Sequence, residues 1–233
     1  MADQLYLSLW FPNFRLESLP DALVSVMRQF ALVSGGPEAK RVAAATVYPI
    51  SFNEAPTYQR IYVNDDRSED TSGSIIENAV AEATEQLHDD MAYEFEMKWN
   101  LWSPEVDPNR IPNPDLDPDI DQDDNYAALD TLWKPQPATV RFLGLGPQFD
   151  DASFEQNGHI RIDFGLDTPW LAETLDDEEL DEDAAKHIQQ NVEKLLAFTL
   201  SVEKNCGISS RLLWTESGEP LAQKLIDRLQ RLN

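Results

Sequence analysis

The sequence predicts an α+β fold for this chain of 233 residues. Three observations predict it: segments with the two-residue period of a strand, segments with the 3.6-residue period of a helix, and the interleaving of the two kinds along the chain. In the clearest strand, residues 93–102, aromatic and aliphatic side chains alternate with Glu, Lys and Asn. A hydrophobic content of 42%, with six Trp, six Tyr and ten Phe, is sufficient for a buried core.

The first half of the chain contains six predicted elements. In chain order they are a strand at 5–11, a helix at 19–33, strands at 42–51 and 58–63, a helix at 74–88 and a strand at 93–102. Ser18 can cap the first helix, and Pro20 suits its first turn. Ser74 and Glu77 have the spacing of a capping box at the start of the second helix. The order βαββαβ is the ferredoxin-like arrangement.

The second half follows a change of composition. Residues 104–131 are rich in proline and aspartate and lack apolar periodicity, which predicts a long surface loop or a linker. Beyond it the predicted elements are strands at 138–145 and 159–165, a helix at 181–205, a strand at 210–216 and a helix at 221–232. We therefore expect an α+β lobe at 1–103 and a second lobe, ββαβα, at 132–233. Two packed lobes and one enlarged antiparallel sheet with helices on one face both fit this order.

The net charge of −25 is concentrated in a few segments. Residues 1–60 are neutral, whereas residues 61–103, 104–131 and 171–183 each carry an excess of at least eight acids. The last of these clusters precedes the predicted helix at 181–205, and a helix dipole favours negative charge at that end. A chain this acidic repels phosphate backbones and anionic lipids, so we expect no direct nucleic-acid binding and no membrane binding.

The sequence also bears on the cellular compartment. Cys206 is the only cysteine, which excludes an internal disulfide and fits a reducing environment. The amino-terminal residues lack the basic and apolar regions of a signal peptide. No stretch reaches the ~18 apolar residues of a membrane span. We expect a cytoplasmic protein.

The acidic segment at 104–131 is the part of the sequence that structural reasons explain least. It contains six closely spaced aspartates, namely Asp115, Asp117, Asp119, Asp121, Asp123 and Asp124. Their spacing resembles the first half of a calcium loop, but the turn glycine and the final glutamate are missing, and Pro114 and Pro118 stiffen the chain. We expect a solvated acidic segment that binds a basic surface, of a partner or of the chain itself, with Trp102 and Trp133 flanking it.

No catalytic residue, metal site or cofactor is predicted. The three histidines, with no Ser or Cys at a recognised spacing, are His88, His159 and His187. His88 is expected at the C-terminal end of a helix, where the dipole favours a cation. Cys206 lacks the electropositive setting of a reactive thiol. Gly144 and Gly146 are expected to end a strand in a turn, because the third glycine and the lysine of a phosphate-binding loop are missing.

These observations predict a non-catalytic, acidic protein-interaction module that binds a basic or amphipathic protein partner. Clustered charge together with many Trp and Tyr residues is typical of interfaces that use aromatic anchors. Two alternatives stay open: a carboxylate-based enzyme on a small substrate, with or without a divalent metal, and an inhibitor that mimics nucleic acid. A homodimer through sheet faces or an edge strand is the simplest assembly.

Overall fold

A computed structural model describes residues 3–36, 40–49, 52–62, 74–105, 132–149, 157–171 and 182–217. The strands are β1 (Gln4–Trp10), β2 (Arg41–Val42), β3 (Ala44–Pro49), β4 (Tyr58–Ile61), β5 (Ser74–Ile75), β6 (Met91–Glu105), β7 (Leu132–Leu145), β8 (Ile160–Leu166) and β9 (Ser210–Thr215). The helices are α1 (Leu19–Ser34), α2 (Ile76–Ala83), α5 (Thr168–Leu171) and α6 (Glu182–Asn205), with a short 3-10 turn at Leu16–Ser18. The helix predicted at 221–232 lies outside the described residues.

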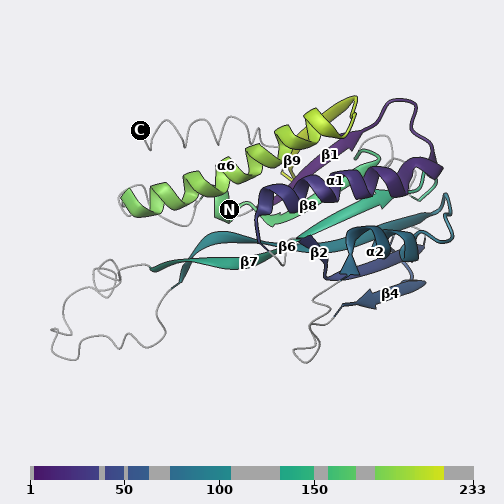
Figure 1. Cartoon of the computed structure of the whole chain (residues 1–233), viewed down its shortest axis with the longest axis horizontal. Coiled ribbons are helices and arrows are strands. Elements are labelled where there is room, and N and C mark those ends of the chain that lie inside the picture. The colour runs from purple at the N-terminus through teal and green to yellow at the C-terminus, as the bar shows by residue number, and fades with distance from the viewer. Residues whose placement is uncertain are drawn as a thin grey trace.

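The main sheet has seven strands in the order β4-β3-β6-β7-β8-β1-β9, and each neighbouring pair is antiparallel (Figure 1). This sheet contains strands from both halves of the chain. Of the two architectures that the sequence allowed, the structure therefore has the enlarged antiparallel sheet rather than two separate lobes. The ferredoxin-like order is not confirmed for the first half. Strand β1 pairs with β8 and β9, so two strands of the second half separate it from β6.

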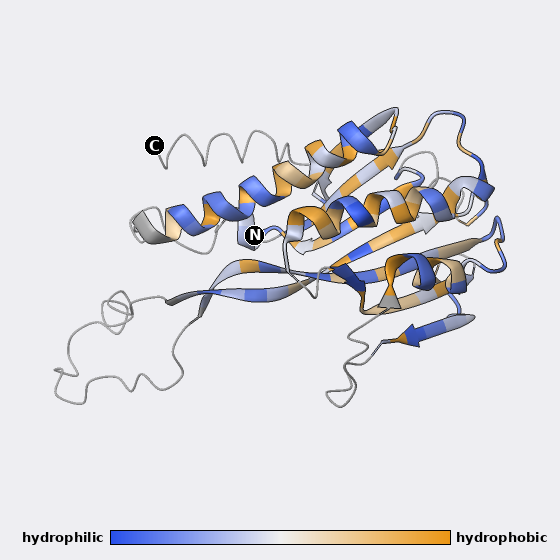
Figure 2. Ribbon diagram, in the orientation of Figure 1, coloured by the Kyte–Doolittle hydropathy of each residue, from blue (hydrophilic) through white to orange (hydrophobic). Residues whose placement is uncertain are grey.

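Helices α1, α2 and α6 pack against one face of this sheet and build one large core with it. Figure 2 shows the hydrophobic residues of α1 and α6 gathered where these helices meet the sheet. The core-facing row across the strands runs Phe95, Phe142, Ile162 and Leu7, which are opposite one another in the register. Neither α6 nor any other described helix combines the length and the apolar content that crossing a membrane requires.

Helix α1 begins and ends close to the predicted residues. Its buried side chains recur at helical spacing, among them Leu19, Leu23 and Phe30. The proline falls in the first turn as predicted, although the Ser18 side chain makes no capping hydrogen bond. The helix ends at Gly35, whose φ of 73° is the left-handed conformation that glycine adopts without steric cost.

Helix α2 is shorter than predicted at both ends. Ser74 does not cap it, because Ser74 belongs to β5 and pairs with Val42 of β2, so the helix begins at Ile76. The helix stops at Ala83, where the Thr84 hydroxyl donates to the Val80 carbonyl oxygen over 2.6 Å. The capping-box prediction was therefore wrong, because the pairing of β5 with β2 holds Ser74 in a strand.

Gly146 ends β7 at a place where two backbone segments approach each other closely. Its N–H donates to the Met91 carbonyl oxygen over 2.8 Å, and the N–H of Gln148 donates to the Asp89 carbonyl oxygen over 2.7 Å. A Cβ atom on Gly146 would lie 2.4 Å from the Asp89 carbonyl oxygen. The prediction that Gly146 lies where a strand ends in a turn is confirmed. The structure adds the reason why a glycine is needed there, which is the close approach of the Asp89 backbone.

We predict that Gly146→Ala lowers the free energy of unfolding by about 3 kcal/mol, because the added methyl group meets backbone atoms that cannot turn away. Gly36→Ala is the matched control, since a Cβ atom there meets nothing within 4 Å. It should be neutral or stabilising by about 0.5 kcal/mol. Urea denaturation followed by circular dichroism measures both, and equal effects of the two substitutions would contradict the close approach at Gly146.

Candidate functional site

Strands β6 and β7 extend well beyond the rest of the sheet as a two-stranded ribbon. Strand β3 pairs with β6 only as far as Glu96, and β8 pairs with β7 only as far as Arg141. Beyond these residues β6 and β7 pair with each other down to Glu105 opposite Leu132. We call residues 98–105 and 132–139 the outer ribbon, which Figure 1 shows leaving the sheet beneath the first half of α6.

The outer ribbon brings the two ends of the acidic segment together. Residues 106–131 follow Glu105 directly and lead directly into Leu132, and these two residues are paired. The six aspartates predicted as partner-binding residues, Asp115, Asp117, Asp119, Asp121, Asp123 and Asp124, all lie outside the described residues. What the structure does describe is the base from which this segment departs and to which it returns.

Two prolines in the outer ribbon explain why its length was underestimated. Strand β7 was predicted to begin at 138 but begins at Leu132, with Pro135 opposite Trp102 and Pro137 opposite Asn100. The backbone N–H and C=O of Trp102 bind a side chain of α6 and so face away from β7. In an antiparallel pair the opposite residue then also directs its backbone outward, so a proline there removes no hydrogen bond of the ladder.

The side chain of Asn191 on α6 makes hydrogen bonds to the backbone of β6 that a neighbouring strand would otherwise make. Its Oδ1 accepts the Trp102 N–H over 2.9 Å, and its Nδ2 donates to the Trp102 carbonyl oxygen over 2.8 Å. The same Nδ2 donates to the Pro169 carbonyl oxygen over 2.9 Å, which ties in α5. Asn191 is 0% exposed, and Lys194 adds a bond from its Nζ to the Asn100 carbonyl oxygen over 2.7 Å. The N–H and C=O of Trp102 and the C=O of Asn100 are thus paired by side chains of one helix.

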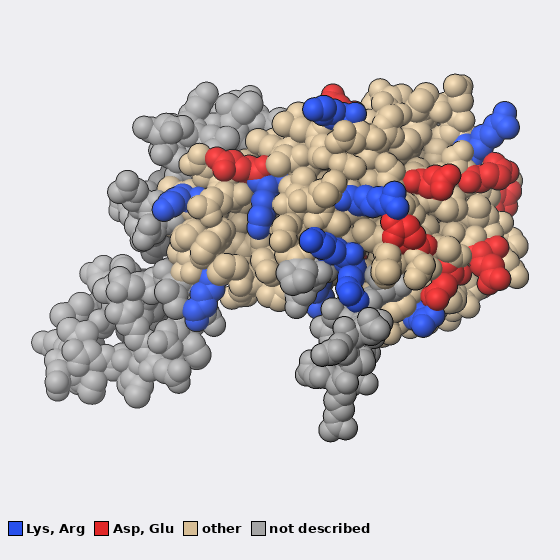
Figure 3. Space-filling view, in the orientation of Figure 1, with Lys and Arg blue, Asp and Glu red and all other residues tan. Residues whose placement is uncertain are grey.

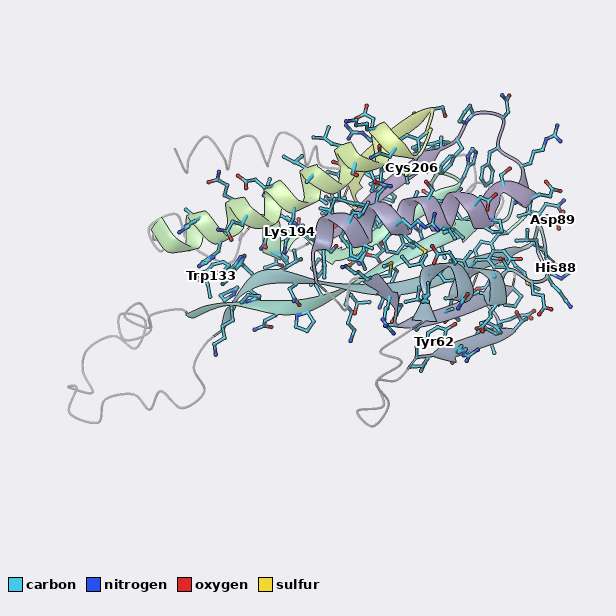
Figure 4. The ribbon with its side chains drawn as sticks, in the orientation of Figure 1. Tyr62, His88, Asp89, Trp133, Lys194 and Cys206 are labelled. Atoms are coloured by element: carbon cyan, nitrogen blue, oxygen red, sulfur yellow. The ribbon has the colours of Figure 1, made fainter. Side chains whose placement is uncertain are left out.

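Trp102 and Trp133, the two flanking residues predicted for binding, both contact the ring of His187. The ring centroids of Trp102 and His187 are 3.9 Å apart, and those of Trp133 and His187 are 5.6 Å apart. The Nδ1 atom of His187 is buried and has no hydrogen-bond partner among the described residues, so ring stacking orients this imidazole. All three side chains are half-buried, and each keeps part of its surface open. Figure 4 shows Trp133 at the ribbon end of the molecule.

A second group of polar side chains lies on the sheet face opposite the helices. Arg141 is 3.1 Å from Glu96 and 3.6 Å from Asp163, and Gln4 donates to Asp163 over 2.6 Å. Burial raises the pKa of the Glu94 carboxyl, and the nearby Arg141 opposes this shift. The carboxylates surround an arginine, which is the arrangement of an ion-pair network. No group of three His, Cys, Asp or Glu side chains in the described ranges is placed to hold a metal ion.

The other two histidines and the cysteine lie apart from the ribbon. His88 follows α2 by several residues, in a loop that the Tyr93 hydroxyl holds by accepting the His88 N–H over 2.8 Å, so its predicted helix-end position was wrong. His159 Nδ1 accepts the Phe11 N–H over 3.0 Å, and burial lowers the pKa of this imidazole. Burial also raises the pKa of the Cys206 thiol, and the Ser25 hydroxyl, 3.4 Å from its Sγ, opposes this shift.

The described part of the chain is much less acidic than the whole. It contains only six more acidic than basic side chains, so most of the net charge of −25 belongs to the remaining segments. On the face shown in Figure 3, Asp and Glu gather at the end that carries α2, while Lys and Arg are spread over the middle and toward the ribbon. Figure 4 labels Asp89 at the acidic end.

Comparison with known proteins yields no match, whether to a protein-family model, to a curated protein or to a solved structure.

We predict that Asn191→Ala lowers the free energy of unfolding by about 3 kcal/mol, because it leaves several buried backbone groups unpaired. Gln189→Ala is the matched control on the same helix, since Gln189 is exposed and bonds only to Glu193 one turn away. Its effect should stay below about 0.5 kcal/mol. Denaturant unfolding measures both changes, and a cost for Asn191→Ala no larger than that of the control would show that α6 does not pair this edge.

We predict a loss of stability as the pH falls below about 6.5, the ordinary pKa of histidine. The folded-state pKa of His159 is lowered, so on acidification the unfolded chain binds this proton before the folded chain does. Proton binding stabilises the unfolded chain relative to the folded chain, and the free energy of unfolding falls. Protonation of Nδ1 also ends its role as acceptor for Phe11. In unfolding measured between pH 7.5 and 5.5, His159→Phe should show less of this pH dependence than the unaltered protein. An unchanged slope in His159→Phe would contradict this assignment.

Proposed function

We propose that this protein is a non-catalytic interaction module that binds a basic protein segment at the tip of the outer ribbon. The observation that carries the proposal is the half-buried Trp102–His187–Trp133 stack at the place where both ends of the acidic segment meet. Partly exposed tryptophans held by rigid neighbours are typical anchors of protein interfaces. Residues 106–131, which join the two strands of the outer ribbon in the sequence, contain eight aspartates and one arginine.

The electrostatic side of the proposal follows from the same geometry. The residues on either side of this acidic segment, Glu105 and Leu132, are paired on adjoining strands. The segment between them in the sequence carries eight aspartates and one arginine, so its charge is of one sign. Such clusters of one sign raise the association rate of an oppositely charged partner and lose strength as salt screens them. The partner that fits is a Lys- or Arg-rich segment with an apolar side chain to lie against an indole.

The site favours this function over the two alternatives. The carboxylates that the structure brings together, Glu96 and Asp163, both contact Arg141, which is the arrangement of an ion-pair network. The acids of the described residues are also spread unevenly, with eight of the nineteen between 74 and 105. A nucleic-acid mimic needs a regular row of charges along one face.

The experiment is affinity capture from a native lysate, followed by titration of the purified partner and of a deca-lysine peptide as a defined cationic probe. The triple variant Asp119→Asn, Asp121→Asn, Asp123→Asn should weaken binding about tenfold at low salt. The double variant Trp102→Ala, Trp133→Ala should weaken binding of the partner by about tenfold or more. It should weaken binding of the deca-lysine peptide less, because this peptide has no apolar side chain to contact the indoles.

The matched control changes the same net charge elsewhere. Glu85→Gln, Asp89→Asn and Asp90→Asn remove three exposed or half-exposed acids at the opposite end of the molecule. This control should bind within about twofold of the unaltered protein. Equal losses in both triple variants would mean that only the overall charge matters and would refute a site at the ribbon. Capture of a DNA-binding protein that DNA displaces would instead favour the inhibitor.

A further inference from the structure

The edges of the main sheet differ in how readily each could pair with a further strand. Strand β4 is only four residues long. Each end strand carries one ion-paired arginine, Arg60 with Glu82 on β4 and Arg211 with Glu203 on β9, so length rather than charge distinguishes them. The free side of the outer ribbon carries Pro135 and Pro137, which cannot donate hydrogen bonds to an added strand. Strand β9 has six residues, no proline and no lysine, and its Leu212 is 51% exposed. Edges of this last kind invite pairing with another strand.

The backbone of β9 directs alternate residues to the open side. On β1, the carbonyl oxygen of Trp10 accepts from Ser209 on the β9 side, whereas that of Leu9 accepts from His159 on the β8 side. Even-numbered residues of β1 therefore face β9, and the pairs Tyr6 opposite Trp214 and Ser8 opposite Leu212 are the hydrogen-bonded ones. The N–H and C=O of Leu213, between them, then point away from β1, to the side of β9 on which no strand of the described residues pairs.

The side chains at this edge are apolar on the face opposite the helices. Trp214 stacks on Tyr6, with ring centroids 4.6 Å apart, and its Nε1 donates to the Ser8 hydroxyl over 2.9 Å. The indole is thus fixed in place before any partner arrives. Leu212 lies two residues away on the same face of the strand. A partner strand that presents a leucine to Trp214 and an indole to Leu212 would cover both side chains.

We infer that β9 pairs with β9 of a second copy of this chain, antiparallel and centred on Leu213, to form a symmetric dimer with a continuous fourteen-stranded sheet. A two-fold axis at Leu213 places the two Leu213 backbones in a hydrogen-bonded pair. It also places Leu212 opposite Trp214 of the second copy, twice, in the closer non-hydrogen-bonded pairs, where aliphatic and aromatic side chains contact best. The strand is therefore complementary to itself.

The charges next to this edge permit the pairing. In this register Arg211 lies opposite Thr215 of the second copy, and Ser210 lies opposite Glu216, so no like charges meet directly. Each copy nevertheless carries a net charge of −25, and the two repel each other over longer distances. Salt screens this repulsion, so dimerisation should strengthen with ionic strength. Binding of a basic partner at the ribbon should instead weaken with ionic strength. Because the two salt dependences are opposite, failure of one proposal can be distinguished from failure of the other.

The test is sedimentation equilibrium of the full chain from about 1 to about 500 µM, at low and at moderate salt. A short strand pair predicts a weak dimer, with Kd on the order of 10–100 µM. Leu212→Glu should raise Kd at least about tenfold, because it removes the leucine that covers Trp214. Leu32→Glu is the charge-matched control, since Leu32 lies on α1 and is 74% exposed. It should leave Kd within about twofold.

Disulfide trapping tests the register. In a Cys206→Ser background, Leu213→Cys should crosslink two copies under mild oxidation, because the Cα atoms of a hydrogen-bonded pair are about 5.5 Å apart. Leu212→Cys should not, because the two copies of residue 212 are offset by two residues and lie too far apart. A monomer at every concentration, an equal loss in Leu32→Glu, or crosslinking at 212 rather than 213 would overturn the proposal.

Discussion

The pairing of β6 with β7 is the interaction on which the rest of this structure depends. It extends over fourteen register pairs, from Ala92 opposite Leu145 to Glu105 opposite Leu132. Strands β3 and β4 add to its β6 side, and β8, β1 and β9 add to its β7 side. The pairing thus joins the two halves of the chain into one sheet and holds both ends of the acidic segment together. Without it, Asn191 would have no strand edge to pair, and Trp102 and Trp133 would not both contact His187.

Most individual elements could be predicted from the sequence, because the period of apolar side chains is a local property. The strand predicted at 5–11 is observed at Gln4–Trp10, and the helix predicted at 181–205 is observed at Glu182–Asn205. The strand order could not be predicted in this way. Alternation of Glu94 with Phe95 fixes which face of β6 is buried, but it does not say which strand lies beside it. That choice depends on contacts between segments that are distant in the chain.

The errors at the candidate site have the same origin. Pro135 and Pro137 indicated a loop, and only the direction of the Trp102 backbone shows that prolines fit there. Asn191 was a signal that was available and missed, since a polar residue among Ile188, Val192 and Leu195 in an apolar stripe needs a buried partner. Trp102 and Trp133 were singled out as the residues flanking the acidic segment. Nothing in the sequence indicated that His187 would join them, because that contact requires the register of the ribbon against α6.

The described residues form one sheet with its helices and carry six more acidic than basic side chains, a small part of the net charge of −25. The central claim is that the outer ribbon is a formed part of the sheet and not a loop. Amide hydrogen–deuterium exchange over residues 97–105 and 132–141 tests this most directly. The account predicts slow exchange for the paired amides and for the N–H of Trp102, similar to that of β6 at 91–96. Exchange there as fast as in the loop at 84–90 would contradict it.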